Sequence, residues 1–256
     1  MFEFDFQSAP SVREVAEDVI SREAPEEGRI PLMVTPNVDQ VVKLNRAENK
    51  ALKKRLLKAQ WILPDGQPIV AMSKIKFGRN GLETRLTGSD FFPVIWELLK
   101  QRPEVPVLFV LPNEELGERF TAERPNTAYY APPFFDLKDE EAFVEVMDQV
   151  KAAQEELGAA YVFIGLGMPK QEHIAIALFD YLSSLSQPLP KTFLLGASFE
   201  FYWGVKKRAP KIYQKLGIEF VHRIITEPRR MAKRYLVDDL AIIPIGFREL
   251  FKKAQS

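Results

Sequence analysis

The sequence predicts an α/β fold with a largely parallel sheet, and three observations support this. Short apolar runs bounded by turn residues are typical of buried strands, and six of them occur between residues 30 and 195. Stretches with helical periodicity separate most of these runs, and such alternation is typical of a parallel α/β sheet. Hydrophobic residues make up 46% and charged residues 27% of the 256 residues, which excludes global disorder and collagen-like repeats.

The predicted elements follow one another along the chain. The expected strands are Ile30–Val34, Trp61–Leu63, Val105–Leu111, Thr127–Tyr130, Tyr161–Gly165 and Thr192–Leu195. The expected helices are Pro36–Asn45, Glu48–Ala59, Phe91–Lys100, Glu114–Ala122, Asp139–Leu157 and Lys170–Leu185. In parallel α/β sheets, ligands bind beyond the carboxyl ends of the strands, so the strand-to-helix turns are the place to look for a site.

The first two turns each allow a structural and a functional interpretation. Thr35 suits a helix N-cap and Pro36 suits the first helical position, where a missing N–H costs nothing. The free N–H groups of such a start, here beside Asn37, also favour a polar or anionic ligand. Asp65 precedes a glycine after the second strand, so it could be a general base or simply the first half of an Asp-Gly turn.

The third turn combines Arg85, Gly88 and Asp90 ahead of a helix. An arginine suits bidentate contact with a phosphate, and a glycine permits close approach of the backbone. The alternative is a capped helix with a surface arginine.

The fourth turn, Gly165-Leu166-Gly167-Met168-Pro169-Lys170-Gln171-Glu172, is the most informative. It matches neither the glycine fingerprint of dinucleotide-binding folds nor the phosphate-binding loop that ends in Gly-Lys-Ser/Thr. Two glycines after a strand and a proline at a helix start still suit a cradle for a phosphate or a sugar, with Lys170 and Gln171 as side-chain contacts. The last strand leads to Gly196 and Glu200 at the same edge.

The net charge of zero hides an uneven distribution. Residues 201–256 carry 13 basic and 5 acidic residues, a balance of +8, whereas residues 1–200 carry −8. Such asymmetry suggests an anionic partner for the basic part: nucleic acid, a phosphorylated lipid or an anionic membrane. The lack of Cys excludes thiol catalysis, disulfides and thiolate metal sites, and the presence of only two His argues against a His-rich metal site.

The basic tail has the pattern of a membrane-surface segment. Arg229, Arg230, Lys233 and Arg234 fall on one helical face. An apolar stripe follows, formed by Leu236, Leu240, Ile243, Phe247 and Phe251, and Pro244 is expected to interrupt it. This combination suits an anionic membrane surface, although a solvated basic face with the stripe packed on the domain is the alternative. Without a signal-peptide pattern or a long apolar stretch, we expect a cytoplasmic protein with no spanning helix.

Seven short motifs occur in a fixed order: T-P-N (35–37), P-D-G (64–66), R-L-T-G-S-D (85–90), G-L-G-M-P-K-Q-E (165–172), G-A-S-F-E-F (196–201), K-R-A-P (207–210) and E-P-R-R (227–230). Together they resemble the WecG/TagA/CpsF family, glycosyltransferase family 26, over about residues 30 to 235. The P-K-Q-E and K-R-A-P elements are the most specific parts of the resemblance.

The resemblance implies a Rossmann-like core over residues 1–200 and a basic helical appendage over residues 201–256 that completes the active site and contacts the membrane. It implies an inverting enzyme, bound to the cytoplasmic face of the membrane, that acts in cell-surface polysaccharide synthesis. The donor would be a UDP-sugar and the acceptor a polyprenyl-diphosphate-linked saccharide. Neither a cofactor nor Mg²⁺ is expected, nucleic acid is not an expected partner, and a homo-oligomer is possible.

The resemblance also implies roles for individual residues. Asp65 matches the family's proposed catalytic base, and Thr35, Asn37 and Gln171 match polar residues of the same pocket. Contact with the donor and its diphosphate is expected from Arg85, Gly88, Asp90, Gly165, Gly167, Pro169, Lys170, Glu172, Gly196, Glu200, Arg208, Arg223 and Arg229. Membrane contact is expected from Arg230, Lys233, Arg234, Phe247 and Phe251.

Two departures from the family pattern bear on the donor. Glu200 stands where many relatives have Asp, and the common E-W-L-Y-R element reads E-F-V-H-R at residues 219–223. They leave the donor open between N-acetylmannosamine and another hexose. Two other functions stay open: a non-catalytic nucleotide-sugar-binding scaffold of a polysaccharide export complex, and a nucleic-acid-binding protein, although no recognisable nucleic-acid-binding module is present.

Overall fold

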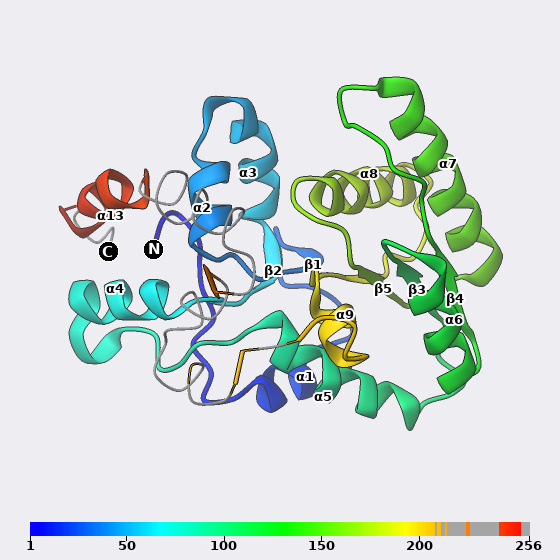
Figure 1. The fold of residues 1–256 in the computed structure, drawn as a ribbon, viewed down its shortest axis with the longest axis horizontal. Helices are drawn as coiled ribbons and strands as arrows, with labels where there is room; N and C mark the ends of the chain where they lie inside the picture. The colour runs from blue at the N-terminus through cyan, green and yellow to red at the C-terminus, as the bar shows by residue number, and fades with distance from the viewer. Residues whose placement is uncertain (208, 211–212, 214–223, 226–240, 252–256) are drawn as a thin grey trace.

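A sheet of six parallel strands forms the centre of the computed structural model, which describes residues 1–207, 209–210, 213, 224–225 and 241–251 (Figure 1). The strands are β1 (Ile30–Val34), β2 (Ala59–Ile62), β3 (Val107–Val110), β4 (Thr127–Tyr130), β5 (Tyr161–Ile164) and β6 (Lys191–Leu194). Their order is β2-β1-β6-β5-β3-β4, and every neighbouring pair is parallel. The predicted sheet is confirmed, and each predicted strand is present with its ends shifted by at most two residues.

The pairing of the last strand, β6, determines which loops lie next to one another. Residues 192–194 of β6 pair with residues 32–34 of β1 on one side, and residues 191–194 pair with residues 161–164 of β5 on the other. The loops that follow β1, β5 and β6 therefore leave the same edge of the sheet, side by side.

Helices cover both faces of the sheet. Along β3, Leu108 and Val110 belong to one core, while Val107 and Phe109 belong to the other, because successive side chains of a strand point to opposite faces. The helices on the first face are α2 (Val38–Leu44), α3 (Lys50–Leu56), α4 (Gln67–Phe77), α7 (Glu140–Leu157), α8 (Lys170–Ser184) and α13 (Ile242–Phe251). Those on the second are α1 (Val12–Ser21), α5 (Gly88–Lys100), α6 (Glu114–Glu123) and α9 (Ser198–Tyr202).

All six predicted helices are present, but one prediction was too long. The helix expected over Glu48–Ala59 is divided into a 3₁₀ turn, η1 (Ala47–Asn49), and α3, which ends at Leu56. Ala59 instead begins β2 and pairs with Ile30. Sheet pairing therefore determines where this helix ends.

Two helices of ten or more residues, α1 and α4, were not predicted from the sequence. In α4 the buried residues are Ile69, Val70 and Ser73, whereas Ile75 is 72% exposed and Phe77 is partly exposed. Its apolar residues are thus spread around the helix and do not form the single stripe that signals an amphipathic helix. A second 3₁₀ turn, η2 (Gly78–Asn80), follows it directly.

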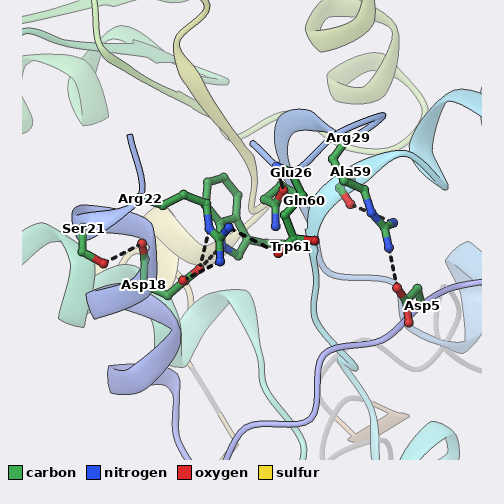
Figure 2. A network of polar contacts seen from close by, with 9 residues as sticks. All are labelled: Asp5, Asp18, Ser21, Arg22, Glu26, Arg29, Ala59, Gln60 and Trp61. Carbon is green, nitrogen blue, oxygen red and sulfur yellow. Dashed lines mark hydrogen bonds and ion pairs between the residues drawn. The ribbon is translucent and has the colours of Figure 1, made fainter. Parts of the chain in front are cut away.

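The N-terminal segment is fastened to the edge of the sheet by polar contacts with β2 (Figure 2). Asp18 on α1 accepts a hydrogen bond from Trp61 Nε1 at 2.7 Å and pairs with Arg22 at 2.8 Å. Gln60 Oε1 accepts from the Glu26 backbone N–H at 2.8 Å. Burial raises the pKa of Asp18, but the hydrogen bonds from Arg22 and Trp61 and the nearby positive charges outweigh burial, so the pKa is lowered overall.

Within the ranges given above, none of the helices combines the length and the apolar character that crossing a bilayer requires.

Candidate active site

An open cleft lies at the carboxyl ends of β1, β2, β5 and β6. Its empty volume is about 1220 Å³, including space open to solvent. The lining comes from the turns that the sequence singled out and includes Thr35, Asn37, Asp65, Thr87, Ser89, Gly167, Gln171 and Gly196. The structure therefore brings together all four residues assigned to catalysis, which come from three separate turns.

The first turn combines a helix cap with the cleft wall. Asn37 is the N-cap of α2: its Oδ1 accepts from the Gln40 backbone N–H at 3.1 Å, and Gln40 Oε1 accepts from the Asn37 backbone N–H at 3.0 Å. The expectation that Thr35 is the cap was wrong. The cap is Asn37, two residues later, where the reciprocal pair with Gln40 satisfies two backbone N–H groups at the start of the helix. Thr35 instead lines the cleft and is 7% exposed.

Asp65 is held against this first turn by backbone contacts. Its N–H donates to the carbonyl of Pro36 at 3.2 Å, and Leu63 N–H donates to the carbonyl of Val34 at 2.9 Å. The following residue, Gly66, has φ +156°, a backbone conformation that residues with a side chain rarely adopt. Asp65 therefore stands just before a bend at Gly66, between β2 and α4, and its partly buried side chain lines the cleft.

The N-terminus of α5 forms another part of the wall. Thr87 caps this helix: its Oγ1 accepts from the Asp90 backbone N–H at 3.0 Å and donates to Asp90 Oδ2 at 2.7 Å. Asp90 thus serves the cap and does not line the cleft, and neither does Arg85. Gly88 lets α5 approach the start of α9, since a Cβ there would lie 3.1 Å from Ser198 Oγ.

The two glycines after β5 lie in different surroundings. A Cβ on Gly165 would lie 2.6 Å from Phe199 Cδ2, so this position has no room for a side chain. Gly167 lines the cleft, and a Cβ there would meet nothing within 4 Å. The peptide bond between Met168 and Pro169 is cis, and Pro169 is the N-cap of α8.

Three consecutive residues at the start of α8 point to different surroundings. Lys170 Nζ lies 4.4 Å from the ring centroids of both Phe134 and Phe135, outside the cleft lining. Gln171 lines the cleft; its Oε1 accepts from the Gly196 backbone N–H at 3.1 Å, and its Nε2 donates to Glu172 Oε1 at 2.9 Å. Glu172 lies behind Gln171, away from the cleft, and is 3% exposed. Burial raises the pKa of the Glu172 carboxyl to about 7, against smaller opposing effects of Gln171 and Lys43.

Two cations in the cleft were not anticipated from the sequence. Lys43 lines it from the last turn of α2 and pairs with Asp39 at 2.9 Å; Lys206 lines it from the segment after α9 and pairs with Glu200 Oε2 at 2.7 Å. Glu200 thus contacts a residue of the cleft wall and is not itself among the lining residues. The i, i+4 spacing of Asp39 and Lys43, one turn beyond the T-P-N motif, was the available signal for the first pair.

Part of the predicted site lies outside the described residues: Arg208, Arg223, Arg229, Arg230, Lys233 and Arg234. The apolar residues of α13 are described: Ile243, Phe247 and Phe251 are 52%, 59% and 82% exposed. This part of the stripe is thus not packed on the domain. Pro244, expected to interrupt the helix, lies in its first turn, where a proline is tolerated.

Comparison with known proteins agrees with this arrangement of motifs. The chain is 27% identical over 190 residues, 72% of this chain and 67% of the relative, to the N-acetylglucosaminyldiphosphoundecaprenol N-acetyl-beta-D-mannosaminyltransferase of Bacillus spizizenii (strain ATCC 23059 / NRRL B-14472 / W23). It is 26% identical over 201 residues, 76% of this chain and 70% of the relative, to the protein of the same name from Staphylococcus aureus (strain NCTC 8325 / PS 47). A family model matches residues 4–256, nearly the whole chain. The chain therefore belongs to the WecG/TagA/CpsF family of glycosyltransferases.

Proposed function

We propose that this glycosyltransferase moves a sugar, N-acetylmannosamine or another hexose, from a UDP-sugar to a polyprenyl-diphosphate-linked saccharide in bacterial cell-surface polysaccharide synthesis. The observation that carries the proposal is the cleft in which Asp65 lies together with Thr35, Asn37 and Gln171. The names of the two relatives support a lipid-diphosphate-linked saccharide as acceptor and an N-acetylmannosaminyl group as one candidate for transfer.

The proposed reaction is a single displacement with inversion at the anomeric carbon. A hydroxyl of the acceptor sugar attacks that carbon, the bond between the anomeric carbon and the diphosphate oxygen breaks, and UDP leaves with the electron pair. Asp65 takes the proton of the attacking hydroxyl. Thr35, Asn37 and Gln171 position the two sugars by hydrogen bonds from the same edge of the sheet.

The leaving diphosphate needs positive charge nearby. Within the described part of the cleft lining, Lys43 and Lys206 supply it. Arg85 and three arginines beyond the described residues, Arg208, Arg223 and Arg229, are further candidates. Because side chains can meet this demand, we propose that transfer proceeds without Mg²⁺, and equal rates with and without EDTA would test this.

The enzyme is also proposed to act on the cytoplasmic face of the membrane, where its lipid-linked acceptor lies. The exposed Phe247 and Phe251 rings of α13, which stack at a centroid distance of 6.5 Å, would enter the interface. Binding of the whole chain to vesicles with anionic lipid, and weaker binding by Phe247→Ser/Phe251→Ser, would support this proposal.

Replacing Asp65 with Asn tests the catalytic assignment. The isosteric amide cannot take the proton, so kcat should fall by about 10²–10⁴-fold while UDP binding is kept. The assay offers UDP-N-acetylmannosamine, UDP-glucose and UDP-N-acetylglucosamine, each with a synthetic polyprenyl-diphosphate saccharide.

The matched control is Asp180→Asn, an exposed carboxylate that pairs with Arg55, and it should leave kcat unchanged. A near-normal rate for Asp65→Asn would remove Asp65 as the base. UDP binding by the wild-type chain without product from any donor would favour the scaffold function instead.

A further inference from the structure

Glu172 is a buried carboxyl group directly beneath the cleft. Its Oε1 accepts from Gln171 Nε2, whereas its Oε2 is inaccessible to solvent and has no hydrogen-bond partner among the described residues. It faces a small cavity lined largely by apolar side chains: Phe4, Val34, Leu44, Leu56 and Leu194. Thr35 and Gln40 line both this cavity and the cleft, so Glu172 lies just behind the cleft wall.

A carboxyl group in this position is costly for the fold. An unpaired buried oxygen costs about 1–3 kcal/mol, and an apolar side chain of similar volume often fits such a site as well or better. The raised pKa of the Glu172 carboxyl reflects the same burial. The retained carboxyl group therefore needs an explanation other than stability.

The contacts of Gln171 provide one, because they fix the orientation of its amide group. The Gly196 backbone N–H is only a donor, so the amide atom facing it at 3.1 Å must be the oxygen. Glu172 Oε1 accepts whether the carboxyl group is ionised or carries its proton on Oε2, so the atom facing it at 2.9 Å must be the nitrogen. Glu172 and Gly196 thus hold the amide from both ends.

The remaining hydrogen-bonding capacity of Gln171 is available to a ligand. An amide nitrogen carries two N–H donors and an amide oxygen two lone pairs, and one of each is used. Gln171 is 2% exposed and lines the cleft, so its remaining N–H and lone pair occupy defined positions there. Without Glu172, the amide would lose one of its two restraints and could rotate.

We propose that Glu172 is a positioning residue that fixes the Gln171 amide for contact with the reacting sugars. The part that concerns sugars rests on the proposed function, whereas the restraint on Gln171 is a property of the free protein. Glu172 itself touches no substrate in this arrangement, so its effect on transfer passes through Gln171.

Two substitutions separate positioning from stability. Glu172→Leu places an apolar side chain of similar volume beside the apolar cavity but removes the acceptor, so the melting temperature should stay the same or rise while kcat/KM falls by about tenfold or more. Glu172→Gln keeps an acceptor oxygen and should retain kcat/KM within about threefold. A normal kcat/KM for Glu172→Leu, or a fall in melting temperature that parallels its loss of kcat/KM, would overturn the proposal.

Amide hydrogen exchange of the free protein gives a measurement that needs no substrate. The Gly196 N–H should exchange faster in Glu172→Leu, as in Gln171→Ala, whereas Glu172→Gln should resemble the wild type. Wild-type exchange in Glu172→Leu would refute the restraint. If the wild-type chain transfers no sugar from any of the three UDP-sugars, the proposed function fails, and the exchange result still decides whether Glu172 restrains Gln171.

A double variant tests the path of the effect. Since Glu172 acts through Gln171, Gln171→Ala/Glu172→Leu should have the same kcat/KM as Gln171→Ala alone. A further loss in the double variant, equal to that of Glu172→Leu in the wild-type background, would show that Glu172 acts independently of Gln171 and would overturn the proposal.

Discussion

Replacing Arg124 with Met should destabilise the protein by about 3–5 kcal/mol. Arg124 is 1% exposed and is the C-cap residue of α6. Its guanidinium joins the end of α5 to the loop before β3 and to the start of β4, through the Leu99, Arg102, Val105, Pro125 and Asn126 carbonyls and Thr127 Oγ1. All five N–H donors of this arginine are therefore engaged by acceptors from three elements.

The magnitude follows from the acceptors that would lose their partner. An unsatisfied buried acceptor costs about 1–3 kcal/mol, and Leu99 is fully buried, so its carbonyl at 3.0 Å bears that cost. The other five acceptors belong to partly buried or exposed residues, where water can replace the lost donor, so together they add about 2 kcal/mol. Methionine keeps most of the apolar volume, so a cavity adds little.

Urea denaturation followed by circular dichroism measures the change. The expected loss is a large part of a stability of about 5–15 kcal/mol, and it would lower the melting temperature by roughly 6–20 °C. The control is Arg13→Met, an exposed arginine that is 3.7 Å from Glu17, for which a change within about 0.5 kcal/mol is expected. A loss below about 1 kcal/mol for Arg124→Met would show that these contacts are not the cause of the stability assigned to them.

Three further predictions concern stability and its dependence on pH. Gly165→Ala should cost about 1–3 kcal/mol, because its methyl group would lie 2.6 Å from an aromatic ring, whereas Gly167→Ala has open space and should leave the urea midpoint unchanged. Because the pKa of Asp18 is lowered, its ionised carboxylate stabilises the fold fully above its ordinary pKa of 3.8, and this stabilisation is lost as the pH falls through the lowered value. The wild type should therefore be more stable than Asp18→Asn at pH 7, and the free energies of unfolding of the two proteins should converge as the pH is lowered. Lys76 and Glu249 form a buried ion pair at 2.6 Å, so Lys76→Met or Glu249→Met would leave one buried charge without its partner and should speed hydrogen exchange in residues 242–251. The double variant should exchange more slowly than either single variant.

Local signals predicted much of the fold. The strands and most helices follow from periodicity and from turn residues, which act over a few positions of the chain. The turns at Thr35, Asp65 and Gln171 could be identified as candidate site elements for the same reason. The helix α4 was not predicted because the exposed Ile75 and Phe77 obscure its apolar periodicity. Its packing against α13 and the first core shows which of its faces is buried.

The remaining site features depend on contacts between distant parts of the chain. Nothing near Lys206 in the sequence indicates that it lines the same cleft as Lys43, because the pairing of β6 with β1 brings the two segments to this edge of the sheet. Likewise, Lys170, Gln171 and Glu172 are neighbours in one motif, yet one lies over aromatic rings, one lines the cleft and one is buried. Helix geometry separates successive side chains by about 100°, so a motif alone does not say which of its members meets the ligand.

Residue types and their spacing were enough to predict the class of the fold, the turns that line the cleft and the division of charge between an acidic core and a basic tail. Each of these depends on residue type and local spacing. The order of the strands, the members of the cleft wall and the hydrogen bonds of Gln171 with Glu172 and Gly196 emerged only from the folded chain. These depend on which strands pair and on how buried polar groups find partners, and both are settled by contacts between residues far apart in the chain.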